Sequence, residues 1–264
     1  MQVKKDWDTA AIQIVEQRKS LTPITPLGQG LTPLDQREGY DLQSHVNQLL
    51  RLDLGDVVGH KIGCTTPVMQ KFLNIPGACA GEIFSQTAFS KNLTVPRGRF
   101  IKLGVECEIV VSLAKTISPS TYSPSSFSAH EVIGALMVGM EIVDDRYKNY
   151  ESIGVPTLIA DNFFDCGCVL GKEFFAWKQL DLNGLRGTTK VNGTVVGSGR
   201  GELIMGAPLN ALRWFVHMSM ERGKVLQKGQ FVMLGSVVET KWLASKDYAE
   251  VEIEELGSIS LTVE

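Results

Sequence analysis

The chain has 264 residues, a length that suits one large domain with a smaller part beside it. Apolar residues make up 44% and charged residues 21%, which excludes a disordered chain, a collagen-like repeat and a disulfide scaffold. The net charge of -3, from 26 basic and 29 acidic side chains, leaves no basic footprint for nucleic acid or an anionic membrane.

In the N-terminal quarter, the spacing of apolar residues predicts helices. One helix is expected over residues 6–20, with Asp6 or Asp8 as its N-cap, and a second over 40–52. The segment 21–35 between them carries three prolines and two glycines, so we expect a loop there.

From residue 57 onward the pattern changes to strands. Val57 to Gly63 is expected to form a strand, a short helix follows at 67–73, and a later helix begins at Pro208. Further strands are expected at 103–113, 191–197, 229–235, 249–254 and 258–263. The second of these segments contains an Asn-Gly pair, which is typical of a tight hairpin.

The order of these elements predicts both fold class and domain organisation. Strands and helices do not alternate regularly, which favours an α+β fold over a doubly wound sheet. We expect residues 1–56 to form a helical part or lid, and residues 57–264 to form a β-rich catalytic domain.

Neither the start of the chain nor its most apolar stretch looks like a targeting or membrane segment. The first residues, MQVKKDWDTA, lack the apolar core of a signal peptide. The run from Val132 to Val143 is about twelve residues long, whereas a membrane span needs about 20. The five cysteines include no Cys-x-x-Cys pair, as expected for reduced thiols. We therefore expect a cytoplasmic protein without membrane contact.

The strongest chemical signal is the segment LGVECEIVVSL at 103–113. Side chains alternate between faces along a strand, so Glu106 and Glu108 share one face while apolar neighbours line the other. Two adjacent carboxylates repel each other and resist burial, and a divalent cation relieves both problems. On these two residues alone, a solvent-exposed strand face is the simpler interpretation.

A third glutamate strengthens the metal interpretation. Glu141 is the one charged residue between Val132 and Val143. Three carboxylates without clustered histidines suit a hard ion such as Mg²⁺ or Mn²⁺. The alternative is that Glu141 is a buried partner of Arg146 or Lys61.

Lys61 is the most notable basic residue near these acids. Glycines at positions 59 and 63 flank it, and such positions permit close approach by a ligand. A lysine there can bind a carboxylate, polarise a carbonyl or move a proton, although most lysines are simply solvated. His60 is expected to face the other side of the same strand and to have a structural role.

Seven segments, taken in chain order, resemble the hydratase/decarboxylase branch of the fumarylacetoacetate hydrolase superfamily. This branch contains the 2-keto-4-pentenoate (2-hydroxypentadienoate) hydratases and the 4-oxalocrotonate decarboxylases. The resemblance covers the chain from about residue 40 to its end. The matching segments are GHKIGCTTPVMQ (59–70), VECEIVV (105–111), MEIVDDR (140–146), ADNFFDCGCVLG (160–171), GAPLNALRWF (206–215), LQKGQFVMLGS (226–236) and ELGSISL (255–261).

The resemblance implies a mixed β-roll core with a smaller N-terminal helical part, usually in a homo-oligomer. It also implies that Glu106, Glu108 and Glu141 ligate Mg²⁺ or Mn²⁺. Lys61 would then contribute to proton transfer or substrate orientation.

The resemblance also implies which residues contact the substrate. Asp161 and Asn162 match a family pair beside the site. Gly235 and Ser236 match a glycine-rich turn close to the substrate. We expect substrate contacts from Gly63, Asp161, Asn162 and Ser236.

Three segments depart from the family pattern. Ala78 to Gly81 stand where family hydratases commonly have Pro-Asp-Phe/Tyr-Gly, so the aspartate associated with proton transfer is replaced by Cys79. Glu82 is the candidate substitute for it. Phe163-Phe164 replaces small residues, and Val237-Val238 replaces a stretch that usually holds a threonine. We interpret these changes as a pocket for a different, more apolar substrate, or for a different reaction.

The resemblance implies a metal-dependent hydratase. It would add water to a 2-hydroxy-2,4-dienoate (a 2-oxo-4-enoate) and give a 4-hydroxy-2-oxo acid. Its partners would be a small 2-oxo acid substrate, other copies of itself, and a decarboxylase or hydratase of the same pathway. The alternatives are a decarboxylase of a 2-oxo dicarboxylate of the 4-oxalocrotonate type and a β-diketone C–C hydrolase. Because of Cys79, an inactive family member that acts as a partner subunit or metabolite binder also stays open.

Overall fold

The computed structural model describes residues 5–264, without the side chains of residues 68 and 72. Its mixed sheets and flanking helices confirm the α+β class. The helices are α1 (Trp7–Lys19), α2 (Gln36–Leu54), α3 (Pro67–Phe72), α4 (Tyr150–Ile153), α5 (Val155–Ala160) and α6 (Pro208–Glu221). The strands are β1 (Val57–Gly63), β2 (Cys79–Phe84), β3 (Ala88–Ser90), β4 (Leu93–Val95), β5 (Leu103–Leu113), β6 (Ile133–Asp144), β7 (Asp165–Leu170), β8 (Arg186–Val191), β9 (Thr194–Arg200), β10 (Phe231–Trp242), β11 (Tyr248–Ile253) and β12 (Gly257–Val263).

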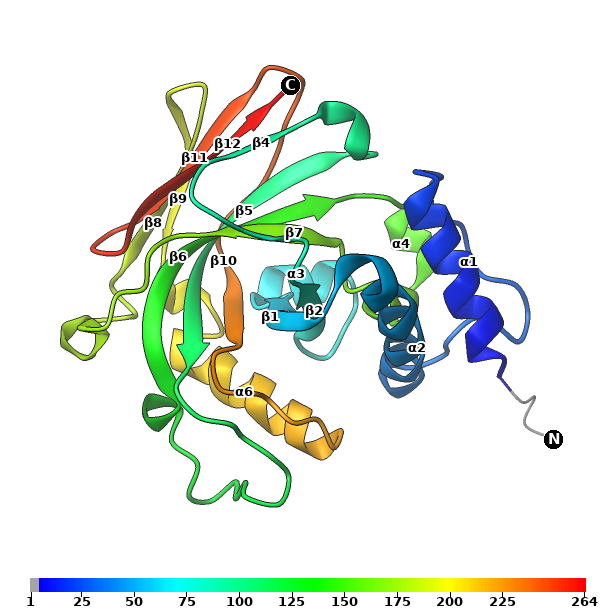
Figure 1. The fold of residues 1–264 in the computed structure, drawn as a ribbon, viewed down its shortest axis with the longest axis horizontal. Coiled ribbons are helices and arrows are strands. Elements are labelled where there is room, and N and C mark those ends of the chain that lie inside the picture. The colour runs from blue at the N-terminus through cyan, green and yellow to red at the C-terminus, as the bar shows by residue number, and fades with distance from the viewer. Residues whose placement is uncertain (1–4) are drawn as a thin grey trace.

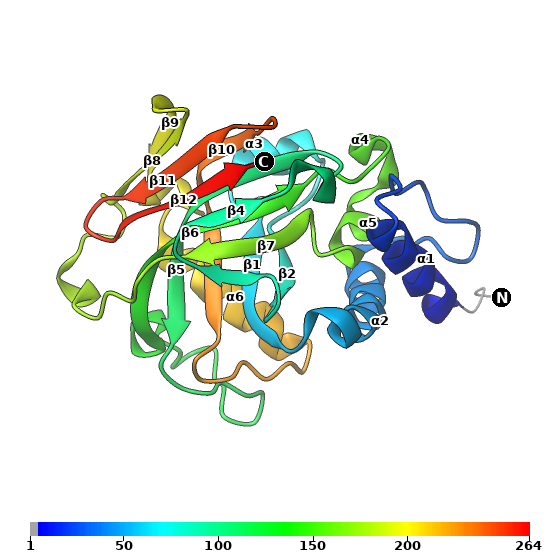
Figure 2. The same cartoon turned by 45° about the horizontal axis from the view of Figure 1, so that its top comes forward.

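Two sheets build the β-rich part. The larger has the strand order β2-β1-β10-β5-β6-β7-β3, and the smaller has the order β4-β12-β11-β8-β9. In the larger sheet β1 runs parallel to β10 and β3 parallel to β7, and the other neighbours are antiparallel. Figures 1 and 2 show this sheet strongly curved, with the smaller sheet on one side and α1 and α2 at the opposite end.

The two faces of β5 explain how the sheets pack. One face is fully buried in the main core and consists of Val105, Cys107, Ile109 and Val111. Apolar residues of β11 and β12, in the smaller sheet, belong to the same core. Full burial of an aliphatic side chain contributes about 1.5–3 kcal/mol, so this face holds the sheets together. The other face of β5, which carries the glutamates, therefore points to the inside of the curved sheet.

The N-terminal helices begin at aspartates. Asp6 accepts a hydrogen bond from the Thr9 backbone N–H (3.1 Å) and caps α1, as predicted. Helix α2 begins four residues before the predicted start, because Asp35 accepts from the Glu38 N–H (2.8 Å) and caps it there. Both helices share a second core cluster with α5, so later residues complete this helical layer. The division at residue 56 stays a prediction, and residues 1–4 of its first part lie outside the described residues.

Most predicted strands are confirmed, but the segment 191–197 is not one strand. The chain reverses at Asn192 and Gly193, both with positive φ (51° and 81°), and this turn joins β8 to β9. Its Asn-Gly pair suits the two-residue hairpin turn, which requires positive φ at both positions. Strand β6 showed no period of two in the sequence because both of its faces are almost entirely buried.

Two expectations about the chain as a whole can be compared with the structure. All five cysteines are free thiols. Within residues 5–264, no helix combines the length and hydrophobicity that crossing a bilayer requires.

Candidate active site

Three glutamates converge on the inside of the curved sheet. Glu106 of β5 lies directly opposite Glu141 of β6, and Glu108 lies on the same face of β5. Glu108 and Glu141 are fully buried, Glu106 is half-buried, and each offers a carboxylate oxygen within 4.8 Å of the others. The alternative of a solvent-exposed strand face is therefore wrong.

Burial makes this cluster electrostatically unfavourable on its own. Burial, reinforced by Glu141 and Glu106, holds the pKa of Glu108 well above its usual range. Burial also raises the pKa of Glu141 to about 8, although Lys61 opposes the shift. Among the described residues, Oε1 of Glu108 and Oε2 of Glu141 are buried without a hydrogen-bond partner. Three carboxylates with unused oxygens fit a hard divalent cation.

Two hydrogen bonds orient the glutamates. The Gly235 N–H donates to Oε2 of Glu108 at 2.9 Å, and the Thr240 hydroxyl donates to Oε1 of Glu106. Irregularities in the pairing of β10 with β5, between Met233 and Lys241, allow β10 to supply both donors. We did not identify Thr240 from the sequence, because these bulges cannot be read from a regular period of two.

Lys61 is part of this cluster. Its side chain is 3% exposed, and Nζ lies 2.6 Å from Oε1 of Glu141 and donates to the Phe163 carbonyl at 2.8 Å. Burial lowers the pKa of Lys61, but the negative charges of Glu141 and Glu106 outweigh it, so the net shift is upward. The suggested pairing of Glu141 with Lys61 is thus confirmed, and it occurs within the carboxylate cluster rather than instead of it.

Two predicted substrate contacts line the same region. An added Cβ at Gly63 would lie 2.9 Å from the Phe163 ring, so this glycine allows the ring to pack against β1. Ser236 lies opposite Glu108, and its hydroxyl donates to the carbonyl groups of Val238 (2.5 Å) and Cys107 (3.3 Å). Direct substrate contact by Gly63 and Ser236 stays a prediction.

The structure separates Glu82 from the cluster. Glu82 pairs with His60 across β1 and β2, whereas Lys61 pairs with Gly81, so the two side chains lie on opposite faces. The Glu82 carboxylate accepts hydrogen bonds from Asn47 (2.9 Å) and Lys224 (3.4 Å). We therefore do not assign Glu82 a role in proton transfer.

Cys79 occupies the position expected for the missing aspartate. It pairs with Gly63, two residues along β2 from Gly81, and therefore lies on the same face as Lys61. Cys79 is fully buried, and burial raises the pKa of its thiol. A protonated thiol does not supply the negative charge of the carboxylate that the resemblance leads us to expect at this position.

Asp161 and Asn162 support the cluster from outside. Both oxygens of Asp161 are engaged, by Arg18 and Arg146 and by the Tyr147 hydroxyl, each at 2.7 Å. The Asn162 side chain donates to Asn47 (2.6 Å) and accepts from the Glu82 N–H (3.0 Å). Their expected contact with substrate stays a prediction. Neither the carbonyl of Phe163 nor Asn47 was identified from the sequence, since a backbone acceptor and a helix-face asparagine leave no pattern.

The chain is similar in sequence to several known proteins. The family described as "Fumarylacetoacetate (FAA) hydrolase C-terminal" matches residues 73–264. A 2-keto-4-pentenoate hydratase from Paraburkholderia phymatum is 28% identical over 96% of this chain and 95% of its own. A 4-oxalocrotonate decarboxylase from Pseudomonas putida is 24% identical over 84% of this chain and 83% of its own.

Solved structures show the same fold. The 4-oxalocrotonate decarboxylase from Pseudomonas putida G7, complexed with magnesium and adipate, has a TM-score of 0.89 at 21% identity, covering 98% of this chain and 97% of that one. Since the family match spans most of the chain and includes all three glutamates, the chain belongs to the fumarylacetoacetate hydrolase C-terminal family.

Proposed function

We propose that this protein is a metal-dependent hydratase that adds water to a 2-hydroxy-2,4-dienoate and yields a 4-hydroxy-2-oxo acid. The observation that carries the proposal is the buried cluster of Glu106, Glu108, Glu141 and Lys61. It occurs in a chain that aligns over almost its full length with proteins named 2-keto-4-pentenoate hydratase.

The three glutamates would hold Mg²⁺ or Mn²⁺. A cation bound there supplies a Lewis acid for a 2-oxo acid, whose carboxylate and carbonyl oxygens are two hard donors. Lys61, fixed between Glu141 and the Phe163 carbonyl, presents an ammonium group that orients the substrate oxygens or donates a proton to them. The Phe163 ring, packed against Gly63, forms an apolar wall beside Nζ.

The charge of the site favours a monocarboxylate substrate. Lys61 is the only lysine or arginine in β1, β2, β5, β6 and β7, and it already contacts Glu141. A 2-oxo dicarboxylate brings a second negative charge that needs its own partner when it is buried. The hydratase is therefore our first candidate. The decarboxylase is second, supported by the overall similarity to 4-oxalocrotonate decarboxylase.

The test is turnover of two substrates by the Mg²⁺-loaded protein. With 2-hydroxypenta-2,4-dienoate we expect loss of dienol absorbance and formation of a 4-hydroxy-2-oxo acid. Release of CO₂ from 4-oxalocrotonate without hydration would favour the decarboxylase, and cleavage of a β-diketone would favour the hydrolase. Metal binding without turnover of any 2-oxo acid would contradict an enzymatic role and favour a metabolite-binding or partner subunit.

Three features of cellular context remain part of this proposal. We expect a homo-oligomer, a cytoplasmic location, and association with a decarboxylase or hydratase of the same pathway. The choice of candidate active-site residues does not depend on any of the three.

A further inference from the structure

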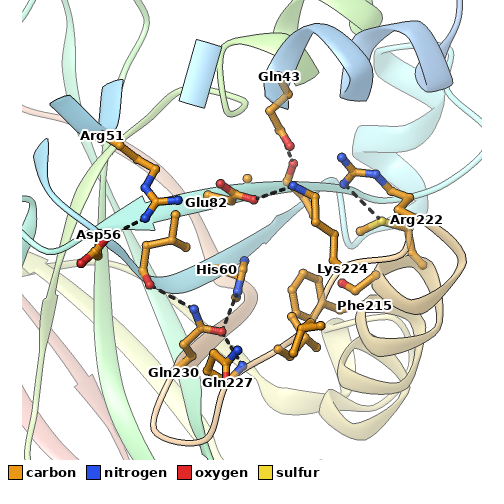
Figure 3. Close-up of a pocket in the computed structure, with 17 residues that line it drawn as sticks. Gln43, Arg51, Asp56, His60, Glu82, Phe215, Arg222, Lys224, Gln227 and Gln230 are labelled. Atoms are coloured by element: carbon orange, nitrogen blue, oxygen red, sulfur yellow. Dashed lines mark hydrogen bonds and ion pairs between the residues drawn. The ribbon is translucent and has the colours of Figure 1, made fainter. Parts of the chain in front are cut away.

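A cavity of about 400 Å³ lies outside the curved sheet, on the face of β1 and β2 opposite to Lys61 (Figure 3). Its walls come from α2, β1, β2, α6 and the segment between α6 and β10. His60 and Glu82, which pair across the two strands, face this cavity, whereas the Lys61 side chain faces the glutamate cluster. The cavity is therefore separate from the candidate active site.

Three cations line the cavity, and one of them lacks an anionic partner. Arg51 pairs with Asp56 at 2.5 Å, and Lys224 pairs with Glu82 at 3.4 Å. No carboxylate in the described part of the chain lies within 4.0 Å of the Arg222 guanidinium. Arg222 is partly buried, and a partly desolvated charge without a close partner is unfavourable, so an anion bound there would be stabilised.

The contacts of Arg222 hold its guanidinium at the cavity without neutralising it. Its guanidinium carbon lies 4.0 Å from the centre of the Tyr40 ring, and its nitrogens donate to the Tyr40 carbonyl (3.4 Å) and to the Met218 sulfur (3.7 Å). Burial lowers the pKa of Arg222, as expected for a desolvated cation. Figure 3 shows the Arg222 and Lys224 side chains among those that line the cavity.

The remaining walls combine polar side chains, among them Gln43, Gln227 and Gln230, with an apolar part. Phe215, Met218, Val225 and Leu226 line the cavity, and the His60 ring lies 5.0 Å from the Phe215 ring. Burial lowers the pKa of His60, so this ring adds no charge at neutral pH. Two cationic groups beside an apolar wall suit a carboxylate that carries a short hydrocarbon chain.

A continuous set of hydrogen bonds joins this cavity to Lys61. Glu82 accepts from Asn47 (2.9 Å), and Asn47 and Asn162 exchange amide hydrogen bonds at 2.6 and 3.3 Å. Asn162 precedes Phe163, whose carbonyl accepts the hydrogen bond of Lys61. A change at Glu82 can therefore reach Lys61 through four polar contacts.

We propose that this cavity is a regulatory site for a small carboxylate, bound by Arg222 and Lys224, and that Glu82 transmits its occupancy to Lys61. The bound carboxylate competes with Glu82 for Lys224. The released Glu82 carboxylate then shifts its contact with Asn47 and loosens the support of the Phe163 carbonyl. The regulatory half of the inference rests on the proposed function, whereas the binding half does not.

Binding is tested by titrating pentanoate against the Mg²⁺-loaded full chain in a calorimeter. Pentanoate lacks the 2-oxo group of a chelating substrate. We expect saturable binding that weakens at least tenfold in Arg222→Gln and in the more exposed Lys224→Gln, which is the second variant should the first fail to fold. Arg213→Gln, an exposed change on the same helix, and Glu108→Gln, which disables the metal site, should bind as the parent does. Absence of saturable binding, or equal binding by the parent and both cavity variants, would overturn the site.

Regulation is tested by following turnover at saturating substrate while pentanoate is added. We expect kcat to fall at least twofold in the parent and in Arg213→Gln, and not to change in Arg222→Gln. Asn47→Ala should keep pentanoate binding and lose the kcat response. A rise in KM alone, or an unchanged kcat at saturating pentanoate, would overturn the regulatory role. If no 2-oxo acid is turned over, the proposed function fails, and the calorimetric result still decides whether the cavity is a site.

Discussion

The carboxyl groups of Glu108 and Glu141 are fully buried, and burial disfavours their ionised forms. Lys61 offsets only part of this cost, and two of their oxygens have no hydrogen-bond partner among the described residues. Carboxylates placed in this way destabilise the metal-free protein and favour a bound cation. Metal affinity and folding stability are therefore coupled through these residues.

Glu108→Gln should separate these two effects. Gln has no ionisable carboxyl group to desolvate, so the metal-free variant should unfold at a higher temperature than the metal-free parent. Its affinity for Mg²⁺ should fall by at least about 10–100-fold, the loss typical of removing a group that merely supports a ligand. Calorimetry and thermal unfolding with and without Mg²⁺ measure both quantities. Parental metal affinity together with normal activity would remove the glutamate cluster from the mechanism.

Lys61→Met should have the opposite effect on the metal-free protein. Breaking a buried ion pair costs about 3–5 kcal/mol in the free energy of unfolding, and added Mg²⁺ should restore much of this loss. Metal affinity should not weaken, while kcat should fall by about 10²–10⁴-fold if Lys61 moves a proton. Urea unfolding and steady-state kinetics test this, with Lys115→Met at an exposed lysine as the control. An unchanged kcat would restrict Lys61 to a structural role.

The turn between α5 and β7 supports Lys61. Asn162, Phe163 and Phe164 all have positive φ (56°, 50° and 67°), a conformation that costs roughly 1–2 kcal/mol per non-glycine residue. Surrounding elements hold it: α2 through Asn47, β2 through the close approach of Gly81, and Arg146 through the Phe164 carbonyl (3.3 Å). Contacts from three elements thus stabilise the strained turn, and the turn holds the Phe163 carbonyl in place as the acceptor for Lys61.

Gly81→Ala should displace this turn. The added Cβ would lie 2.9 Å from the Asn162 carbonyl oxygen, which is backbone and cannot rotate away. We expect a loss of about 1–3 kcal/mol in stability and a larger change in kcat than in KM. Gly77→Ala is the matched control, because an added Cβ there meets nothing within 4 Å, and its effect should stay within about 0.5 kcal/mol. Equal behaviour of the two variants in unfolding and kinetic assays would contradict the proposed support.

Asp161→Asn should reveal how the same turn depends on pH. Burial raises the pKa of Asp161, but Arg146 and Arg18 outweigh it, so the net shift is downward. The stabilisation is therefore fully present above the unfolded value of about 3.9 and is lost as pH falls through the folded value. At pH 7 the variant should lose about 3–5 kcal/mol, because two buried arginines lose their partner. Urea unfolding should show this difference shrinking below pH 4, whereas Asp53→Asn, at an exposed ion pair, should cost under about 1 kcal/mol at either pH.

At the scale of the whole molecule, the second sheet gives the curved sheet its two different faces. The smaller sheet covers one face of β5 and β6 with apolar side chains, and the other face is left to enclose the glutamates. A further apolar cluster of Ile83, Val110, Met137, Phe231 and Met233 lies on the same inner face. A metal bound by the three glutamates would therefore stabilise β5 and β6, two strands whose other face is part of the main core.

Removal of the metal should destabilise the protein as a whole. A ligand that binds only the folded state adds about 2.7 kcal/mol at a concentration 100 times its Kd. Adding a chelator to the Mg²⁺-loaded protein should therefore lower the unfolding temperature in one cooperative transition. In Glu108→Gln the chelator should have little effect, and an equal shift in that variant would place the bound metal elsewhere.

The local pattern of the chain was enough to predict the class of the fold, the two N-terminal helices with the cap of the first, strand β5 and the candidate metal ligands. These features depend on contacts between near neighbours: Asp6 caps its own helix, and Glu106 and Glu108 share a face because strand side chains alternate. The hydrogen bond from Thr240 to Glu106 could not be predicted, because it depends on bulges in the pairing of β10 with β5. The start of α2 could not be predicted either, because the spacing of apolar residues does not show that Asp35 caps the helix.

The amino-acid sequence by itself determined which groups are candidates for the chemistry: three carboxylates and one lysine, with a cysteine where the family resemblance leads us to expect an aspartate. Only the tertiary structure decided which of them meet. The register between β1 and β2 places Lys61 inside the curved sheet and Glu82 outside it, because Glu82 pairs with His60 and not with Lys61. The physical reason is that a strand alternates its side chains between two faces, while the curvature of the sheet and the packing of other elements decide which face encloses the site.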